Sequence, residues 1–233
     1  PYKKINATSI VLLRIDKERG HTSFTLFPTE ACVSIEGRYV KLGAIYADYG
    51  LQFLMDRIHA LTGVTIDNYI VSSYETLPHL QNTLLAGGVS CTVPDNLYLN
   101  DLQRDITVDL QMGRHLLDGN GAVQLLIFDA YNDGINTQEA TTFRYVREFY
   151  TQYTNIVNYA LATKNISAII EHSNTDLTAE KLLDSVDMMF KYSASQIEIN
   201  VPTTQKHIAN KTLTVIEDED AIRAFSNYRK IYY

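Results

Sequence analysis

A strand-helix-strand pattern constrains the fold of this 233-residue chain most strongly. Ile66–Ser72 is apolar enough for a buried strand, and Glu75–Leu85 follows with the spacing of a helix. A glycine pair ends that helix, and the chain returns through Val89–Val93, a second strand. Strands joined through a helix are typical of layered α/β domains, so this pattern predicts the α/β class.

Apolar patterning on both sides of this segment adds further elements of the same kind. Strands are predicted at residues 10–15, 23–27, 32–35, 105–110, 197–201 and 212–216, and helices at 41–49, 51–62, 121–126, 142–161, 167–171 and 177–190. The aromatic stripe of the longest helix, which starts at Thr142, is expected in the core. Together these elements predict a single mixed-sheet α/β/α layered domain, flanked by helices and followed by a C-terminal tail.

The charge balance argues against a general nucleic-acid-binding protein. The chain carries 20 Lys and Arg against 27 Asp and Glu, a formal net charge of −7, whereas such proteins normally present a basic field. No apolar run approaches the length of a membrane span. The composition, with 45% hydrophobic and 20% charged residues, is ordinary for a globular domain and leaves a local anion pocket open.

Motifs for several common chemistries are missing from the sequence. There is no phosphate-binding glycine loop of the Walker kind and no G-x-S-x-G nucleophile elbow. The two cysteines, Cys32 and Cys91, do not make a disulfide framework and lack a metal-ligand spacing. The six histidines are scattered without a paired helical spacing, so we expect them as surface or partly buried side chains rather than ligands.

Gly113–Asn136 is the stretch in which a functional loop is most plausible. Asp118 is a candidate N-cap for the short helix predicted at residues 121–126. A polar loop with turn-forming residues follows, and it includes Asp129 and Asp133. By composition this loop is a surface connection, and the alternative is a loop that faces a cleft.

The run ITVDLQMGRHLLDGNGAVQLLIF, from Ile106 to Phe128, resembles the G-x-x-x-L-D-G-x-x-A-L-x-Y-x-R-x-R segment of the LytR-CpsA-Psr family, the cell envelope-related transcriptional attenuators. Similar segments occur in the family's order on both sides: IVLLRIDKERGHTSFTLFP from Ile10, KLGAIYADYG from Lys41, IDNYIVSSYETL from Ile66, GGVSCTVP from Gly87 and NTDLTAEKLLDSV from Asn174. The resemblance covers residues 5 to 202 and depends on the order and spacing of the segments together.

The resemblance implies an extracytoplasmic domain that a single N-terminal membrane helix, outside this sequence, tethers to the cell membrane. Residues 1–6 would then be a linker from that anchor, residues 7–202 the LytR-CpsA-Psr-like domain, and residues 203–233 a C-terminal extension. Within the extension, the acidic run at 217–220 followed by Arg223 has the charge order that favours a helix, so it is better explained as a helix start than as a metal site.

The activity implied by the resemblance is transfer of a phosphoglycan from a polyprenyl pyrophosphate carrier to peptidoglycan, usually with Mg²⁺. Such a site needs carboxylates for the metal and arginines for the phosphates. Lys41 matches a family lysine and Glu30 keeps one carboxylate, but Ile127 and Asp129 stand where the central motif has arginines. Further departures lie at Thr8, Ser9, Thr29, Ala31 and residues 136–140. Each lost charge-assisted contact is worth about 1.5–3 kcal/mol, so we do not expect the family's mechanism.

Three functional hypotheses remain open for this degenerate site. The first is a non-catalytic member, with Glu30, Lys41 and Asp129 at the catalytic positions, that binds a polyprenyl lipid, a cell-wall glycan or a protein partner, and no nucleic acid. The second is a transferase with a rebuilt site, in which Glu30 and Asp133, with Asp129 and Lys41 nearby, hold Mg²⁺. The third, a regulatory role, is disfavoured because nothing resembles a DNA-reading motif.

The sixteen tyrosines bear on the choice of ligand. An open apolar tunnel would favour lipid binding, whereas a tunnel filled with Tyr and Phe side chains would leave a role in surface interactions.

Overall fold

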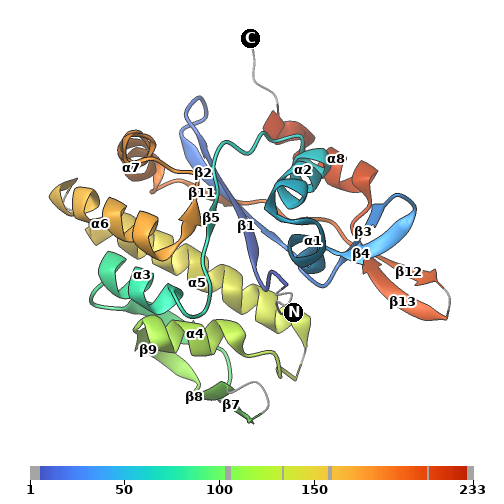
Figure 1. Cartoon of the computed structure of the whole chain (residues 1–233), viewed down its shortest axis with the longest axis horizontal. Helices are drawn as coiled ribbons and strands as arrows, with labels where there is room; N and C mark the ends of the chain where they lie inside the picture. Colours follow the sequence, from blue (N-terminus) through green and yellow to red (C-terminus); the bar gives the residue numbers. More distant parts are fainter. Residues whose placement is uncertain (1–5, 103–105, 133, 157–158, 209, 230–233) are drawn as a thin grey trace. The chain divides into compact units, whose positions relative to one another are not determined.

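The computed structural model describes residues 6–102, 106–132, 134–156, 159–208 and 210–229 (Figure 1). The chain divides into two compact units. Unit 1 comprises Pro1–Arg14, Ser23–Asp67 and Ile197–Tyr233, and unit 2 comprises Ile15–Thr22 and Asn68–Gln196. Both units combine helices with strands, so the predicted α/β class is confirmed.

Unit 1 contains sheet strands covered by helices. Its elements are most of β1 (Ile10–Asp16) and β2 (His21–Phe27), then β3 (Cys32–Ile35), β4 (Arg38–Lys41), α1 (Leu42–Tyr49), α2 (Leu51–Thr62), β12 (Thr204–Ile208), β13 (Lys211–Val215) and α8 (Asp218–Arg229). One sheet has the order β1-β2-β11, where β11 spans Gln196–Glu198, and a second has the order β12-β13-β3-β4. In the second sheet β13 runs parallel to β3 while the other pairs are antiparallel, so the sheet is mixed.

The core of unit 1 draws on segments far apart in the sequence. Its fully buried members include Phe27, Val33, Leu42, Ile45, Leu61, Ile216 and Phe225. The rings of Phe27 and Phe225 stack with their centroids 6.4 Å apart. The strand at Lys211–Val215 and the helix start near Asp218 were predicted, but the sequence did not indicate that α8 supplies a core side chain.

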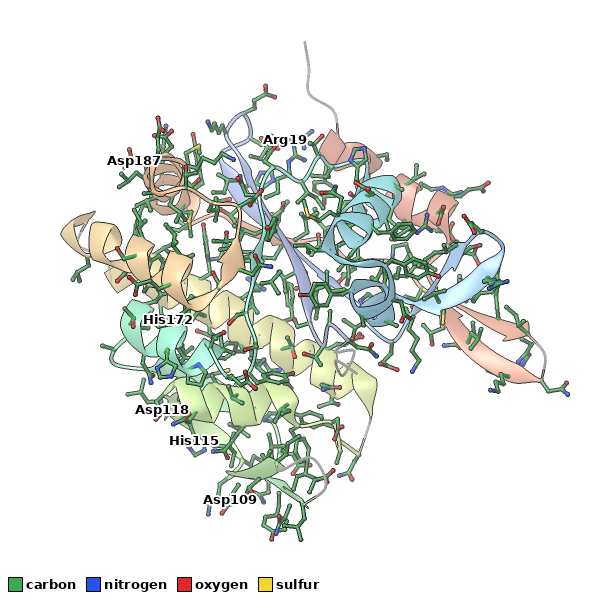
Figure 2. All side chains as sticks on the ribbon, in the orientation of Figure 1. Arg19, Asp109, His115, Asp118, His172 and Asp187 are labelled. Carbon is green, nitrogen blue, oxygen red and sulfur yellow. The ribbon has the colours of Figure 1, made fainter. Side chains whose placement is uncertain are left out.

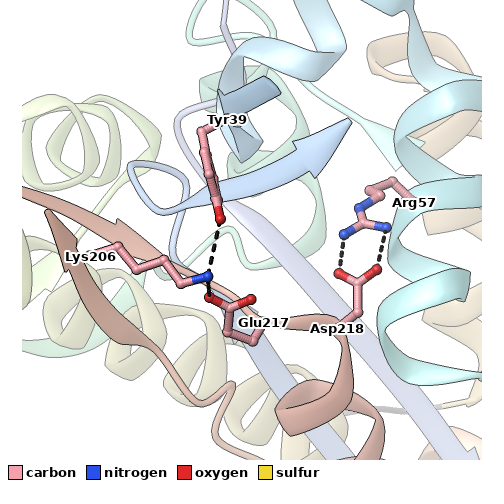
Figure 3. A network of polar contacts seen from close by, with 5 residues as sticks. All are labelled: Tyr39, Arg57, Lys206, Glu217 and Asp218. Atoms are coloured by element: carbon pink, nitrogen blue, oxygen red, sulfur yellow. Dashed lines mark hydrogen bonds and ion pairs between the residues drawn. The ribbon is translucent and has the colours of Figure 1, made fainter. Parts of the chain in front are cut away.

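Polar contacts tie the C-terminal segment to the rest of unit 1 (Figure 3). The guanidinium of Arg57, on α2, donates two hydrogen bonds to the carboxylate of Asp218, the first residue of α8. Lys206, on β12, contacts the Glu217 carboxylate and donates to the Tyr39 hydroxyl at 3.1 Å. The hydrogen bond to Glu217 raises the pKa of Lys206, with Tyr39 as a second cause. The acidic run therefore starts a helix, as its charge order predicted. The structure adds that Glu217 and Asp218 pair with cations of other elements.

Unit 2 is built from helices and short antiparallel strand pairs. Its elements are β5 (Ile70–Val71), α3 (Leu77–Leu84), β6 (Val89–Val93), β7 (Leu97–Asp101), β8 (Ile106–Leu110), β9 (Gly113–Leu117), α4 (Gly119–Ile127), α5 (Ile135–Ile156), α6 (Tyr159–His172), β10 (Asn174–Thr175) and α7 (Ala179–Tyr192). The strands pair as β6 with β9, β7 with β8 and β5 with β10.

Aromatic side chains of α5 lie in the core of unit 2, as the sequence predicted. Tyr145, Phe149 and Tyr153 form a row whose ring centroids are 6.4 and 6.2 Å apart, and Phe190 of α7 continues it at 6.3 Å. Tyr145 and Tyr153 are 4% and 6% exposed. The Tyr145 hydroxyl donates to Gln81, a fully buried side chain whose amide donates in turn to the Leu117 carbonyl at 2.8 Å. The row is therefore core packing, and the buried Tyr145 hydroxyl has an acceptor.

Several predicted boundaries were wrong. The buried strand predicted at residues 66–72 is only β5, and Ile70 is 51% exposed. Ile66 instead packs its side chain against the core of unit 1 from irregular chain, so its hydrophobicity did not indicate a strand. The sequence also missed β9, which lies inside Gly113–Asn136, and it started the longest helix seven residues late, because α5 begins at Ile135.

Candidate functional site

The structure brings Glu30 and Lys41 together in unit 1. Lys41 is the last residue of β4 and lies opposite Cys32 of β3, and Glu30 occupies the turn just before β3. This pairing places the Lys41 ammonium beside the Glu30 carboxylate, to which it donates a hydrogen bond. The side chains of Lys41 and Glu30 are 55% and 52% exposed, so the result is an ion pair at the surface.

The turn that carries Glu30 also covers the start of α1. Leu42 N–H donates to the Ala31 carbonyl at 2.9 Å, and Gly43 N–H donates to the Thr29 carbonyl at 2.8 Å. A side chain at Gly43 would place its Cβ 2.5 Å from the Ala7 carbonyl oxygen, so this close approach requires glycine. Free amides at a helix N-terminus are ready anion ligands, but these two amides already have acceptors.

The cysteines contribute no reactive thiolate to this region. Cys32 lies next to the ion pair and Cys91 lies on β6 in unit 2, and both are buried free thiols. Burial is the main cause that raises the pKa of each thiol. Thiols with a raised pKa are protonated at neutral pH, which is typical of structural cysteines.

The Leu-Asp-Gly part of the central motif has a structural role in unit 2. Asp118, labelled in Figure 2, is the N-cap of α4, as predicted. Its Oδ1 accepts from Gly121 N–H at 2.8 Å. Gly119 N–H donates to the Asn82 side chain at 2.8 Å. A Cβ on Gly119 would lie 2.4 Å from the Pro78 Cα, so α3 and α4 approach each other here at backbone distance.

The two positions at which the motif has arginines lie at and just after the end of α4. Ile127 is the last residue of α4, and its partly buried side chain packs against the core of unit 2. Asp129 is exposed, two residues further on. Asp133 lies outside the described residues. Among the residues that are described, no three His, Cys, Asp or Glu side chains gather to hold a metal ion.

Sequence reasoning missed a polar face on β7 and β8, formed by Tyr98, Asn100, Thr107 and Asp109. The signal was available, because LYLND at Leu97–Asp101 alternates apolar and polar residues with the period of a half-buried strand.

In the described parts of the chain, no helix has the length and apolar character needed to cross a membrane.

A model of the LytR_cpsA_psr family matches residues 3–230 of the chain. Comparison with curated proteins finds no match. Among solved structures, TagV of B. subtilis is similar with a TM-score of 0.79 and 14% identity, over 95% of this chain and 87% of that one. The LytR-Csp2A-Psr enzyme from Actinomyces oris has a TM-score of 0.74 and 16% identity, over 96% and 85%. TagT bound to LIIa-WTA has a TM-score of 0.73 and 15% identity, over 95% and 84%.

Identities this low show that the fold is shared and no more. The family assignment comes from the sequence match, which spans nearly the whole chain. The chain therefore belongs to the LytR-CpsA-Psr family.

Proposed function

We propose that this protein is an extracytoplasmic, non-catalytic LytR-CpsA-Psr protein that binds a glycan of the cell envelope, free or lipid-linked, and does not transfer it. The observation that carries the proposal is the ion pair between Glu30 and Lys41. The family binds phosphates with a set of cationic side chains. By resemblance, Lys41 is the position of that set at which this chain keeps a cation. Its charge is balanced by a carboxylate that the turn holds beside it.

The surroundings of this pair also disfavour a pyrophosphate. An exposed ion pair is worth at most about 1 kcal/mol, so Glu30 alone does not prevent Lys41 from meeting a phosphate. However, a pyrophosphate at Lys41 would lie against the Glu30 carboxylate, and the first two amides of α1 have their own acceptors. At the motif's arginine positions, Ile127 supplies no charge and Asp129 supplies the wrong one. The groups that would stabilise the developing charge of phosphoryl transfer are therefore replaced.

The choice of a glycan as ligand has two supports. Solved structures of TagT bound to LI-WTA and to LIIa-WTA are among the similar folds, where WTA denotes wall teichoic acid. In unit 2 of this chain, the aromatic row of α5 packs on itself and on Phe190. These large side chains occupy the interior of unit 2, which favours recognition of the sugar part over burial of a polyprenyl chain there.

The alternative is an Mg²⁺-dependent transferase that attaches a glycopolymer from polyprenyl pyrophosphate to peptidoglycan through a rebuilt site. One observation favours it: Glu30 and Lys41 are adjacent and half exposed, so a carboxylate and a cation are both available to a ligand. For this reading the sequence predicts Glu30 and Asp133 as metal ligands, and of these the structure describes Glu30 alone.

A transfer assay separates the two functions. The protein is incubated with a polyprenyl-pyrophosphate-linked saccharide, peptidoglycan oligomers and Mg²⁺, and the released polyprenyl phosphate and the glycan-peptidoglycan product are measured by mass spectrometry. The variants are Lys41→Ala and Glu30→Gln, and Lys211→Ala is the control for an exposed lysine elsewhere in unit 1. Binding of the saccharide is measured in parallel by calorimetry.

We expect saccharide binding without turnover in every variant. Mg²⁺-dependent product that disappears in Lys41→Ala and persists in Lys211→Ala would establish the alternative. Failure to bind any envelope saccharide would remove the proposed ligand.

A further inference from the structure

The β7–β8 hairpin of unit 2 has two different faces. One face turns Leu97, Leu99, Val108 and Leu110 toward the core of unit 2. The other face carries Tyr98, Asn100, Thr107 and Asp109, all exposed, and Tyr98 is 71% exposed. The face therefore presents one large aromatic ring, open to a ligand, among polar side chains.

The register of the hairpin groups these four side chains tightly. Tyr98 lies directly opposite Asp109, and Asn100 lies directly opposite Thr107. Opposed Cβ atoms in an antiparallel pair are about 4.5–5.5 Å apart, and residues two apart on one strand are separated by about 6.5–7 Å. The four side chains therefore surround an area comparable to one pyranose ring.

The chemistry of the face is that of saccharide recognition. The face of the tyrosine ring is apolar and carries partial negative charge, so the C–H groups of a pyranose can stack on it. Asp109 supplies carboxylate acceptors, Asn100 supplies a donor and an acceptor, and the Thr107 hydroxyl can do either, which suits adjacent sugar hydroxyls. Within the described part of the chain, none of these four side chains makes a hydrogen bond or an ion pair that would compete.

The charge of the face selects among glycans. Its four residues include one carboxylate and no cation, in a protein whose net charge is −7. A polymer rich in phosphate would be repelled by Asp109 and would find no cation on this face. The face therefore suits a neutral glycan.

The hairpin is also held in place before any ligand arrives. Asp109 N–H donates to the Gln124 side chain of α4 at 3.0 Å, and Met112 N–H donates to the Asn96 side chain at 2.8 Å. These bonds fix the strand end that carries Asp109 and the chain at the open end of the hairpin. A preformed face loses less conformational entropy when it binds.

We propose that the outer face of the β7–β8 hairpin, formed by Tyr98, Asn100, Thr107 and Asp109, binds a neutral pyranose glycan. The inference deepens the proposed function, because it rests on glycan binding and names the surface and the class of sugar. It does not involve Glu30 or Lys41, which belong to unit 1.

The test is calorimetric titration of the whole chain with a soluble oligomer of N-acetylglucosamine, in the absence of metal and lipid carrier. Poly(glycerol phosphate) is the anionic comparison. The variants are Tyr98→Ala, Tyr98→Phe and Asp109→Ala, and Met112→Ala is the matched control, since Met112 is 63% exposed next to the hairpin but outside the face. All three substituted positions are at the surface, so circular dichroism is expected to report an unchanged fold.

We expect the oligosaccharide to bind and the phosphate polymer not to bind. Tyr98→Ala and Asp109→Ala each weaken binding by about tenfold or more, whereas Tyr98→Phe and Met112→Ala keep it. Absence of oligosaccharide binding, equal binding by Tyr98→Ala, or an equal loss in Met112→Ala would each overturn the inference. Catalytic transfer accompanied by Tyr98-dependent sugar binding would instead overturn only the proposed absence of catalysis.

Discussion

The side-chain amide of Gln152, on α5, bonds to both backbone groups of Ser90, on β6. Gln152 Oε1 accepts from Ser90 N–H at 2.8 Å, and Gln152 Nε2 donates to the Ser90 carbonyl at 3.0 Å. One glutamine thus takes the place of a neighbouring strand at the edge of β6 that faces away from β9. The contact joins residues 62 positions apart.

The first prediction concerns this contact. Gln152→Ala leaves an N–H and a carbonyl of β6 without their partner, so the free energy of unfolding is expected to fall by about 1–3 kcal/mol. Gln52→Ala is the control, because the Gln52 amide donates to Asp56 on the surface of the same helix, and we expect a change within about 0.5 kcal/mol. Urea denaturation measures both. Equal stability of the two variants would contradict the prediction.

Gly119 provides a steric prediction. Gly119→Ala would press a methyl group against the Pro78 backbone, which cannot move without displacing α3, so we expect a loss of about 1–3 kcal/mol. Gly87→Ala is matched to it, because a Cβ at Gly87 meets nothing within 4 Å. Thermal unfolding distinguishes the pair, and a common melting temperature would show that α3 and α4 are not in backbone contact.

Tyr145 gives a prediction about pH. Burial raises the pKa of the Tyr145 hydroxyl above its ordinary value. Its contribution to stability is therefore fully present below the unfolded pKa of about 10 and is lost as pH rises toward the folded pKa, by up to about 1.4 kcal/mol per pH unit. As pH rises, the unfolded state loses the Tyr145 proton before the folded state does, so the free energy of unfolding decreases.

Tyr145→Phe should flatten that alkaline loss. At pH 7 the same variant should cost about 1–3 kcal/mol, because Gln81 loses the donor to its buried oxygen. Tyr98→Phe, which removes an exposed hydroxyl, is the control at pH 7. Denaturation midpoints are measured between pH 7 and 11. If stability falls with pH equally in the wild type and in Tyr145→Phe, the alkaline loss does not come from Tyr145.

Phe225 tests whether α8 belongs to the core of unit 1. Phe225→Ala removes a ring that is 1% exposed and stacked on Phe27, so we expect a loss of about 3–5 kcal/mol. Ile222→Ala changes the same helix at a position 39% exposed and should cost less than about 1 kcal/mol. Chemical denaturation gives both values. A small effect at Phe225 would mean that α8 is peripheral.

Local patterns predicted many elements because their causes are local. The β1–β2 hairpin, α1, α2 and β6 were predicted within one or two residues. Gly63 ends α2 with φ 65°, a left-handed position that favours glycine, so the end of this helix also has a local cause. The strand predicted at residues 66–72 was wrong because an apolar residue can also reach a core from irregular chain. The periodicity of apolar residues alone does not distinguish a strand from such a segment.

The candidate site was predictable in part. Resemblance to the family named Glu30 and Lys41, and the structure adds that the two side chains meet. Asp129 is exposed in unit 2, and its predicted role stays a prediction, as does that of Asp133. The polar face of β7 and β8 was missed because alternation shows which side chains share a face, but only the register shows which strand lies opposite.

The sequence by itself determined the α/β class, the family and the cap at Asp118. Through the family resemblance it also predicted that Ile127 and Asp129 stand where the motif has arginines. These follow from residue identity and from contacts within a few positions of the chain. Only the tertiary structure decided that Lys41 faces Glu30, that Gln152 closes the edge of β6 and that Phe225 stacks on Phe27. Each of these contacts joins separate elements, and such pairing depends on how whole elements pack rather than on any local pattern.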